Sequence, residues 1–274
     1  MSLFTVDPEK CKRDGICAEV CPFHIIDFSD TEAVPKPAEG AEGECLNCGH
    51  CMSACPHGAL ELASMSLSDC TPMGKETAIR PEQLDRLLRG RRSCRVYKDK
   101  ALSRETLEQL IRMACYAPSG HNVQPTSWRV VYDKGEVLGL AGLTVAFLRG
   151  IVADQPDFAR SIHADHIVGG WDEGKDLVFR GAPHVIMAHA PEDERTAPYG
   201  CVIAQAYVEL AAGALGLGAC WAGYFNIASQ NYPPLQEALQ LPEGHQNFGA
   251  MMIGHPKYPY HRIPLRNEPR ITWR

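Results

Sequence analysis

Seven of the twelve cysteines lie before residue 56, and their spacing is that of a metal-binding segment. Between Cys45 and Pro56 the chain reads C-x2-C-x2-C-x3-C-P. Thiolates at this spacing wrap one iron–sulfur cluster, and the proline turns the chain away from it. Cysteines two residues apart also occur in structural zinc sites, but two interleaved runs that both end in Cys-Pro favour iron–sulfur.

The preceding stretch is an imperfect copy of this run at an offset of 34 residues. The superposition pairs Cys11 with Cys45, Cys17 with Cys51, Cys21 with Cys55 and Pro22 with Pro56. The one ligand position that differs is Asp14, which falls on Cys48. An aspartate therefore stands where the repeat predicts a thiolate.

In tandem runs of this kind the fourth cysteine binds the other cluster, which defines two ligand sets. One set holds a [4Fe-4S] cluster with four cysteines: Cys45, Cys48, Cys51 and Cys21. The other combines three cysteines with a carboxylate: Cys11, Asp14, Cys17 and Cys55. Asp14 either binds the fourth iron as a hard oxygen ligand or binds so weakly that the site holds a [3Fe-4S] cluster, because sulfur is the preferred donor.

Residues 3–62 resemble the bacterial two-cluster ferredoxins along their whole length. The resemblance implies a small ferredoxin-like domain, which we assign to residues 1–65, with two iron–sulfur clusters. Residues 66–78 are rich in Ser and Thr and poor in large apolar side chains, a composition that predicts a linker. A second domain then covers residues 79–274.

Helix and strand patterns alternate in the second domain. A helix is expected over 81–90, with Pro81 in its first turn, and another begins at the cap residue Ser103. Strand-like runs and a further helix follow, at 128–132, 184–190 and 248–254 for the strands and 201–217 for the helix. This order predicts an α+β fold with helices packed on a central mixed sheet.

Four separated stretches in this domain are similar to motifs of the FMN-dependent nitroreductase family. They read RRSCRVY at 91–97, APSGHNVQP at 117–125, GLGACWAG at 216–223 and, more weakly, GHPKYPYHRIPLRN at 254–267. The resemblance implies a nitroreductase-like α+β sandwich and a homodimer that binds FMN in grooves at the subunit interface.

The same resemblance implies the FMN-binding residues. Arg91, Ser93 and Arg266 correspond to a phosphate clamp, with Arg92 and Arg262 as additional members, and Arg forks suit phosphate oxygens. A cation at Arg95 would lie near flavin N1 and O2. The remaining contacts are the Asn122 side chain at a flavin edge and backbone groups near N5 and O4 at Trp221, Ala222 and Gly223. No side chain is expected to be catalytic, because the chemistry occurs at flavin N5.

Fusing clusters with a flavin predicts a converter between one-electron and two-electron chemistry. Electrons would pass from the clusters to FMN and then to a small conjugated acceptor such as a nitroaromatic or a quinone. External ferredoxin and NAD(P)H are the candidate donors, and residues 144–181 are expected to cover the flavin and select the substrate. The alternative is an electron-relay subunit without a small substrate; a flavin-destroying or dehalogenating enzyme is a weaker third interpretation.

Charge and hydropathy exclude two classes of partner. The net charge is −6 and the basic residues are scattered, so nothing in the sequence supports binding to nucleic acid. The most apolar stretch, residues 201–225, contains Gln205 and Glu209 and is expected to be a buried helix that leads into a strand, not a membrane span. No secretory signal is visible at the start, so we expect the reducing cytoplasm.

Overall fold

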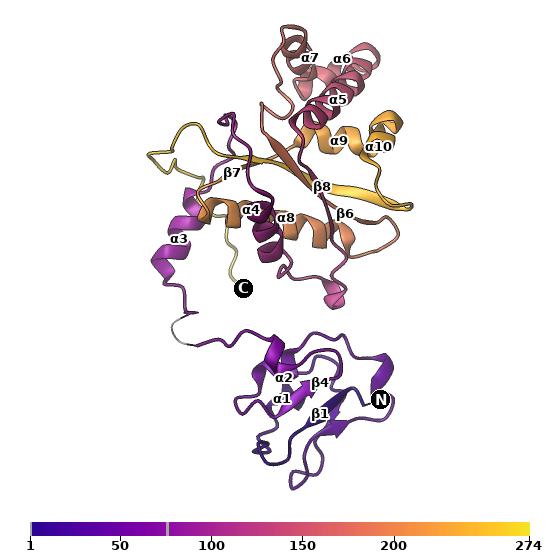
Figure 1. Cartoon of the computed structure of the whole chain (residues 1–274), viewed down its shortest axis with the longest axis vertical. Helices are drawn as coiled ribbons and strands as arrows, with labels where there is room; N and C mark the ends of the chain where they lie inside the picture. Colours follow the sequence, from indigo (N-terminus) through magenta and orange to yellow (C-terminus); the bar gives the residue numbers. More distant parts are fainter. Residues whose placement is uncertain (1, 75–76) are drawn as a thin grey trace. The chain divides into compact units, whose positions relative to one another are not determined.

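The computed structural model describes residues 2–74 and 77–274, which form two compact units (Figure 1). The first unit comprises Met1–Ala78 together with His121–Val123. The second comprises Ile79–Gly120 and Gln124–Arg274. The candidate cluster ligands lie in the first unit, and the nitroreductase-like motifs other than His121–Val123 lie in the second.

Two short, two-stranded antiparallel sheets frame the first unit. Strand β1 (Phe4–Val6) pairs antiparallel with β4 (Leu60–Leu62), and β2 (Ile26–Asp27) pairs antiparallel with β3 (Lys36–Pro37). The helical pieces are short: α1 (Ile16–Glu19), α2 (His50–Ala54), η1 (Ala41–Gly43) and η2 (Leu67–Asp69). The buried core is correspondingly small and consists of Phe4, Cys17, Ile26, Met52, Leu60 and Leu62. Leu67 and Cys70 pack against it from the edge.

The sequence repeat of the first unit is also a repeat of backbone conformation. Left-handed φ angles recur in pairs 34 residues apart: Arg13 and Asn47 at 55° and 52°, Gly15 and Gly49 at 75° and 72°, His24 and Gly58 at 52° and 56°. Gly15 and Gly49 occupy the N-cap positions of α1 and α2. Asp14 and Cys48 therefore lie on the same local backbone, between two left-handed residues.

The second unit is built on a four-stranded sheet in the order β5-β6-β8-β7. Its strands are β5 (Ser127–Val131), β6 (His184–Pro191), β7 (Gly218–Trp221) and β8 (His245–Gly254). They pair antiparallel, and a bridge between Ser93 and Ala219 adds a parallel pairing beside β7. The four strands of the sheet are thus antiparallel throughout, and the parallel element of the expected mixed sheet is limited to this isolated bridge.

Both faces of this sheet are buried, which explains why β6 and β8 read as nearly continuous apolar runs. Two hydrophobic cores lie on opposite faces of the sheet, a larger one that includes residues of α5, α7, α9 and α10 and a smaller one that includes residues of α4 and α8. Val185 and Met187 of β6 point into the larger core, while Ile186 between them points into the smaller one. Figure 1 shows α4 and α8 against one face and α5, α7, α9 and α10 on the other side. The helix bounds are α3 (Pro81–Gly90), α4 (Arg104–Ala114), α5 (Lys134–Asp154), α6 (Pro156–Ser161), α7 (Ala164–Asp172), α8 (Ala197–Ala214), α9 (Gly223–Asn231), α10 (Pro233–Leu239) and the turn η4 (Gly120–Asn122).

The expected α+β sandwich is confirmed, and so are several of its local signals. Helix α3 spans the predicted residues, and Ser103 caps α4 by accepting a hydrogen bond from the Thr106 backbone N–H at 3.2 Å. Leu107 and Leu110 lie on the buried face of α4. The apolar stretch 201–225 is indeed a helix that leads into a strand, because α8 is followed directly by β7.

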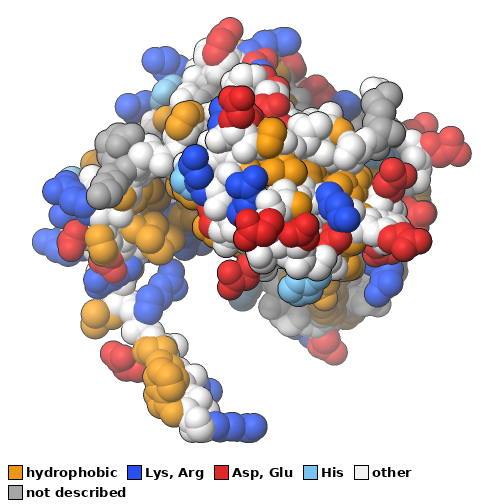
Figure 2. Space-filling model, turned by 90° about the horizontal axis from the view of Figure 1, so that it is seen from below, with side chains coloured by type: hydrophobic (Ala, Val, Ile, Leu, Met, Phe, Trp, Pro, Cys, Tyr) orange, Lys and Arg blue, Asp and Glu red, His pale blue; other side chains and the backbone are white. Residues whose placement is uncertain are grey.

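Helix α5 is long and apolar enough to cross a membrane by length and composition alone. Its buried residues recur along one face, from Val137 through Leu140, Val145 and Leu148 to Ile151. This face packs in the larger core with α7, α9 and α10. This packing on one face is that of a core helix in a globular domain. On the face of the molecule seen from below in Figure 2, acidic and basic side chains are interspersed.

We predict that Gly218→Ala destabilises the second unit. A Cβ on Gly218 would lie 2.6 Å from Sγ and Cβ of Cys94, and Cys94 is fixed by a hydrogen bond from its backbone N–H to Ala219 O at 2.9 Å. Overpacking of this kind costs about 1–3 kcal/mol. Gly150→Ala in exposed α5 backbone, where a Cβ meets nothing within 4 Å, is the control and should stabilise by up to about 1 kcal/mol. Equal melting temperatures for the two variants would contradict this account of β7.

Candidate cofactor sites

The four-cysteine set converges on one cavity in the first unit. Cys21, Cys45, Cys48 and Cys51 all line it, together with the apolar residues Phe4, Ile26 and Leu62. Burial, with smaller contributions from Cys21 and Cys48, raises the pKa of the Cys51 thiol to about 11. Iron binds thiolates, so cluster assembly here must release protons.

The second set converges on a separate cavity of the same unit. Cys11, Asp14, Cys17 and Cys55 line it, and so does His57. Burial raises the pKa of the Cys17 thiol, and the nearby Cys11 and Cys55 add to the rise. The structure thus brings together the residues of each set, with the fourth cysteine of each run beside the other run's ligands.

The donors fit iron–sulfur clusters by number, type and spacing. In residues 2–74 and 77–274 no three His, Cys, Asp or Glu side chains lie close enough to hold a single metal ion. A cluster with four irons takes one ligand at each iron, so its ligands stand further apart than those of a lone ion. When bound, the clusters would supply one-electron chemistry.

The carboxylate of Asp14 is held by its own turn. Its Oδ1 accepts a hydrogen bond from the backbone N–H of Ile16 at 3.2 Å. Its Oδ2 lies 3.8 Å from Nε2 of His57. The carboxylate therefore lies at the wall of the cavity that Cys11, Cys17 and Cys55 share with it.

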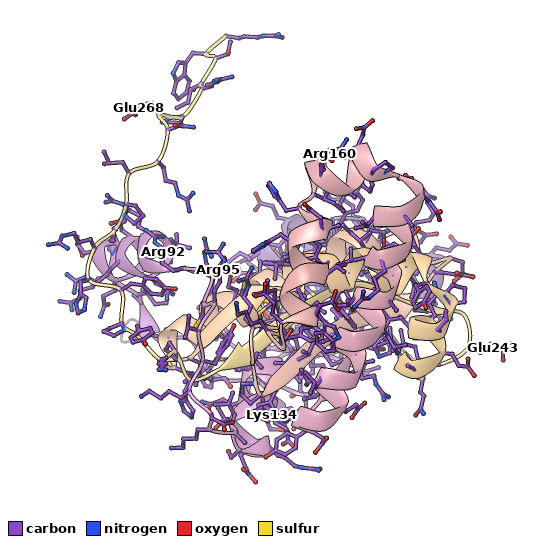
Figure 3. The ribbon with its side chains drawn as sticks, turned by 90° about the horizontal axis from the view of Figure 1, so that it is seen from above. Arg92, Arg95, Lys134, Arg160, Glu243 and Glu268 are labelled. Atoms are coloured by element: carbon purple, nitrogen blue, oxygen red, sulfur yellow. The ribbon has the colours of Figure 1, made fainter. Side chains whose placement is uncertain are left out.

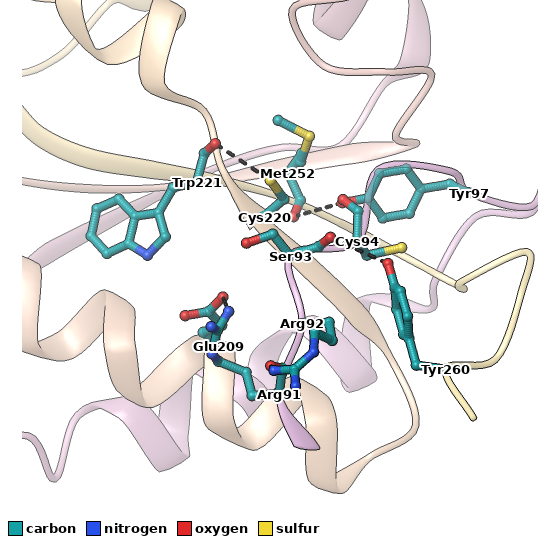
Figure 4. A network of polar contacts seen from close by, with 10 residues as sticks. All are labelled: Arg91, Arg92, Ser93, Cys94, Tyr97, Glu209, Cys220, Trp221, Met252 and Tyr260. Carbon is teal, nitrogen blue, oxygen red and sulfur yellow. Dashed lines mark hydrogen bonds and ion pairs between the residues drawn. The ribbon is translucent and has the colours of Figure 1, made fainter. Parts of the chain in front are cut away.

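In the second unit the segment RRSCRVY is fixed against the edge of the sheet (Figure 4). Ser93 bridges to Ala219, and the buried Tyr97 hydroxyl donates to Cys94 O at 2.8 Å. Burial raises the pKa of the Cys94 thiol, and burial likewise raises that of Cys220, so neither is an activated nucleophile. The arginines of this segment, Arg91, Arg92 and Arg95, are therefore attached to backbone that is bound to the sheet.

Arg91 already carries an ion pair. Its Nη1 donates to Oε1 of Glu209 on α8 at 2.7 Å, and the two side chains are 26% and 11% exposed (Figure 4). Arg92 Nη1 donates to Arg91 O at 2.6 Å. The sequence reasoning missed Glu209 as a site residue, although a charged residue inside the apolar stretch 201–225 was a signal for it.

A cavity of about 760 Å³ opens beside this ion pair. Arg91, Arg92, Glu209, Tyr258 and Tyr260 are among its lining residues. Figure 3 shows Arg92 and Arg95 on the side from which the C-terminal segment, marked by Glu268, extends. This cavity therefore combines cations with aromatic side chains, as a site for a phosphorylated aromatic cofactor requires.

The start of the C-terminal segment is bound to the stretch that contains Ser93 and Val96. The Lys257 backbone N–H donates to Val96 O at 3.0 Å, and the Tyr260 hydroxyl donates to Ser93 O at 3.3 Å. Residues 257–274 form neither helix nor strand, and Arg262 and Arg266 are exposed within them. Among the described residues that line the 760 Å³ cavity, Arg91 and Arg92 appear but Arg262 and Arg266 do not.

The stretch Trp221 to Gly223 joins β7 to α9. Trp221 ends the strand, Ala222 is the N-cap residue of α9, and the Ala222 N–H donates to Ala250 O at 2.9 Å. A Cβ on Gly223 would meet no atom within 4 Å, so space lies open at the helix start. The backbone there fits close approach of a flavin, although the Ala222 N–H is already used by the sheet.

Asn122 belongs to the other unit. It ends η4 with a left-handed φ of 53°, and its segment His121–Val123 groups with the first unit. The structure therefore does not place Asn122 in the same unit as Arg91 and Trp221. Its expected contact with a flavin edge stays a prediction.

Comparison with known proteins decides the family. The model of the nitroreductase family matches residues 88–255, and that of the 4Fe-4S dicluster domain matches residues 9–59. The chain belongs to the nitroreductase family. It is an FMN-dependent oxidoreductase of the nitroreductase type that carries a 4Fe-4S ferredoxin domain, as the sequence motifs predicted.

Individual proteins are similar to one or the other part of this chain. A protein of Archaeoglobus fulgidus, provisionally named an NADH dehydrogenase/NAD(P)H nitroreductase, is 27% identical over 64% of this chain and 87% of its own. A crystal structure of a nitroreductase of Desulfitobacterium hafniense with bound FMN is 26% identical, with a TM-score of 0.58 over 71% of this chain and 99% of that one. Ferredoxin-1 of Nitratidesulfovibrio vulgaris is 48% identical over 31 residues, which are 11% of this chain and 50% of the ferredoxin.

We predict that Asp14→Cys removes a difference in stability between the two clusters. If Asp14 is a ligand, its hard carboxylate grips iron less firmly than a thiolate would, so mild oxidation should release one iron from this cluster alone. Electron paramagnetic resonance after air exposure should show a three-iron signal in the wild type that Asp14→Cys abolishes. The all-cysteine cluster of the same sample is the control, and identical spectra from the two proteins would show that Asp14 does not face the cluster.

Proposed function

We propose that this nitroreductase passes electrons from its two ferredoxin-type clusters to FMN and from FMN to a small conjugated acceptor, such as a nitroaromatic or a quinone. Flavin accepts electrons one at a time and gives them as a pair, which suits such an acceptor. The chain's own residues bind the cofactors, orient them and shape the site for the acceptor.

The observation that carries this proposal is the presence of two complete ligand sets in a nitroreductase chain. Each set lines its own cavity, and each has four donors. A bound pair of clusters supplies single electrons, which a small acceptor that needs two cannot use directly. The converter interpretation gives both units a role, whereas a relay subunit would need no substrate site.

Arg91, Ser93 and Arg95 are proposed to bind and orient FMN in the second unit. Glu209 fixes the direction of the Arg91 guanidinium, which leaves its other N–H groups for a phosphate. Of these arginines, Arg91 and Arg92 line the 760 Å³ cavity, while the exposed Arg262 and Arg266 belong to a segment that forms neither helix nor strand. The open space at Gly223 supports the backbone contacts proposed for Trp221, Ala222 and Gly223.

A homodimer is proposed as the assembled form. Helix α8 buries Cys201, Ala204 and Val208 on one side, yet Val202 and Tyr207 on its other side are 44% and 38% exposed. The C-terminal segment exposes further apolar side chains, above all Leu265 and Trp273. Exposed apolar surface on this scale marks an interaction site, which supports the dimer implied by the family resemblance.

The electron donor is proposed to be an external ferredoxin, with NAD(P)H as the competing candidate. A ferredoxin would deliver single electrons to the clusters, whereas a nicotinamide would deliver hydride to the flavin itself. Residues 144–181, which include part of α5 and all of α6 and α7, are proposed to select the acceptor. Ala159, Ala164 and Ile167 anchor these helices in the larger core.

We predict that removing single FMN-phosphate contacts weakens FMN binding by roughly tenfold to a hundredfold, because each charge-assisted contact is worth about 1.5–3 kcal/mol. Arg91→Ala alone would leave Glu209 without its partner, so the informative variant is Arg91→Ala with Glu209→Gln. Arg266→Ala should act in the same direction, and Arg270→Ala in the same exposed segment is its control. Flavin fluorescence titration measures the affinity; unchanged affinity in both test variants would place the phosphate elsewhere.

The proposed function is tested by a strictly anaerobic screen of acceptors with the iron- and FMN-loaded protein. Nitroaromatics and quinones should be reduced when reduced ferredoxin is the donor, and a variant lacking a cluster ligand, Cys48→Ala, should lose this activity. A protein that reduces none of these acceptors but passes electrons to a second protein would be the relay subunit. Activity that is equal in Cys48→Ala would exclude the clusters from the electron path.

A further inference from the structure

The two cluster cavities differ at a second position besides the ligand itself. At the repeat offset of 34 residues, Asp14 corresponds to Cys48 and His57 corresponds to Phe23. His57 lines the cavity of Asp14, and Phe23 lines the cavity of Cys48. Where the ligand is a thiolate the neighbouring side chain is apolar, and where it is a carboxylate the neighbour carries a polar nitrogen.

At the second differing position, the side chain of His57 faces the carboxylate of Asp14. Nε2 of His57 lies 3.8 Å from Oδ2 of Asp14, while Oδ1 accepts from the Ile16 N–H at 3.2 Å. Both oxygens are thus faced by nitrogen from a fixed direction. The two side chains are 39% and 35% exposed, and both line the cavity that Cys11, Cys17 and Cys55 share.

We propose that His57 is a positioning residue for Asp14, whose Nε2 orients the carboxylate at the corner of the cluster that takes the fourth iron. The inference rests on the proposed ligation by Asp14. Side chains that contact a metal ligand and fix its orientation typically raise metal affinity tenfold to a hundredfold. Without them, the ligand must be ordered when the metal binds. A carboxylate needs such support more than a thiolate, because it is the harder and less preferred donor for these irons.

The test measures uptake of Fe²⁺ by the full-length protein. Mild oxidation first removes one iron, then reductant and graded Fe²⁺ are added anaerobically; uptake of one Fe²⁺ by the reduced three-iron cluster gives the four-iron cluster and needs no further electron. The loss of the integer-spin signal of the reduced three-iron cluster reports the affinity, because reductant alone already removes the signal of the oxidised three-iron form. The all-cysteine cluster and the FMN content of each sample show that the variant is folded.

His57→Phe copies the other cavity and is the informative variant. We expect it to weaken Fe²⁺ binding about tenfold to a hundredfold, whereas His57→Gln, which keeps a donor, should retain most of the affinity. In an Asp14→Cys background, where mild oxidation should release no iron, His57→Phe should not bring back the three-iron signal. Equal Fe²⁺ affinity in wild type and His57→Phe would overturn the proposal, and so would an effect that persists in the Asp14→Cys background.

A further arm separates this proposal from the one on which it rests. If Asp14→Ala weakens Fe²⁺ binding while His57→Phe does not, Asp14 is a ligand and only the role of His57 is overturned. If Asp14→Ala binds Fe²⁺ as the wild type does, ligation by Asp14 itself fails. Nitrogen hyperfine coupling to the cluster that disappears in His57→Phe would make His57 a direct ligand, which also contradicts a positioning role.

Discussion

Convergence of four candidate donors on each of two cavities is the constraint on which the first unit depends. Its core has few buried side chains, so burial alone contributes little to holding a unit of this small size in one conformation. The turns that aim the ligands need left-handed backbone at repeated positions, and glycine supplies it at Gly15 and Gly49. Metal binding and folding are therefore coupled in this unit, because the ligands come from both halves of the repeat.

In the second unit the constraint is different: charged residues, among them Arg91 and Glu209, are held beside a large cavity. Its sheet is buried on both faces, and the segment from Arg91 to Tyr97 is bound along the edge of that sheet. The Arg91–Glu209 pair then fixes a cation at the cavity wall without needing the cofactor to be present. The two units thus differ in what holds them together. The first has a small core and two sets of candidate metal ligands, and the second has a sheet buried between two hydrophobic cores.

Much of this was readable from the sequence because local chemistry dictates it. The cysteine spacing predicted the cluster domain, the Ser103 cap predicted the start of α4, and the family motifs predicted the fold of the second unit. Glu209 and His57 were not predicted, since each acts on a residue far away in the chain and only the folded structure shows the pairing. The positions of Arg266 and Asn122 were not predictable for a related reason: motif order says nothing about which unit, or which copy, a segment joins.

The central claim is that electrons reach FMN through the clusters of the same chain. Rapid mixing of the oxidised protein with reduced ferredoxin, followed by freeze-quenching and optical detection, tests it most directly. The account predicts that reduced-cluster signals appear first, that flavin reduction follows, and that Cys48→Ala loses ferredoxin-driven flavin reduction while its flavin is still reduced by light. Flavin reduction that precedes the cluster signals, or that proceeds at the wild-type rate in Cys48→Ala, would contradict it.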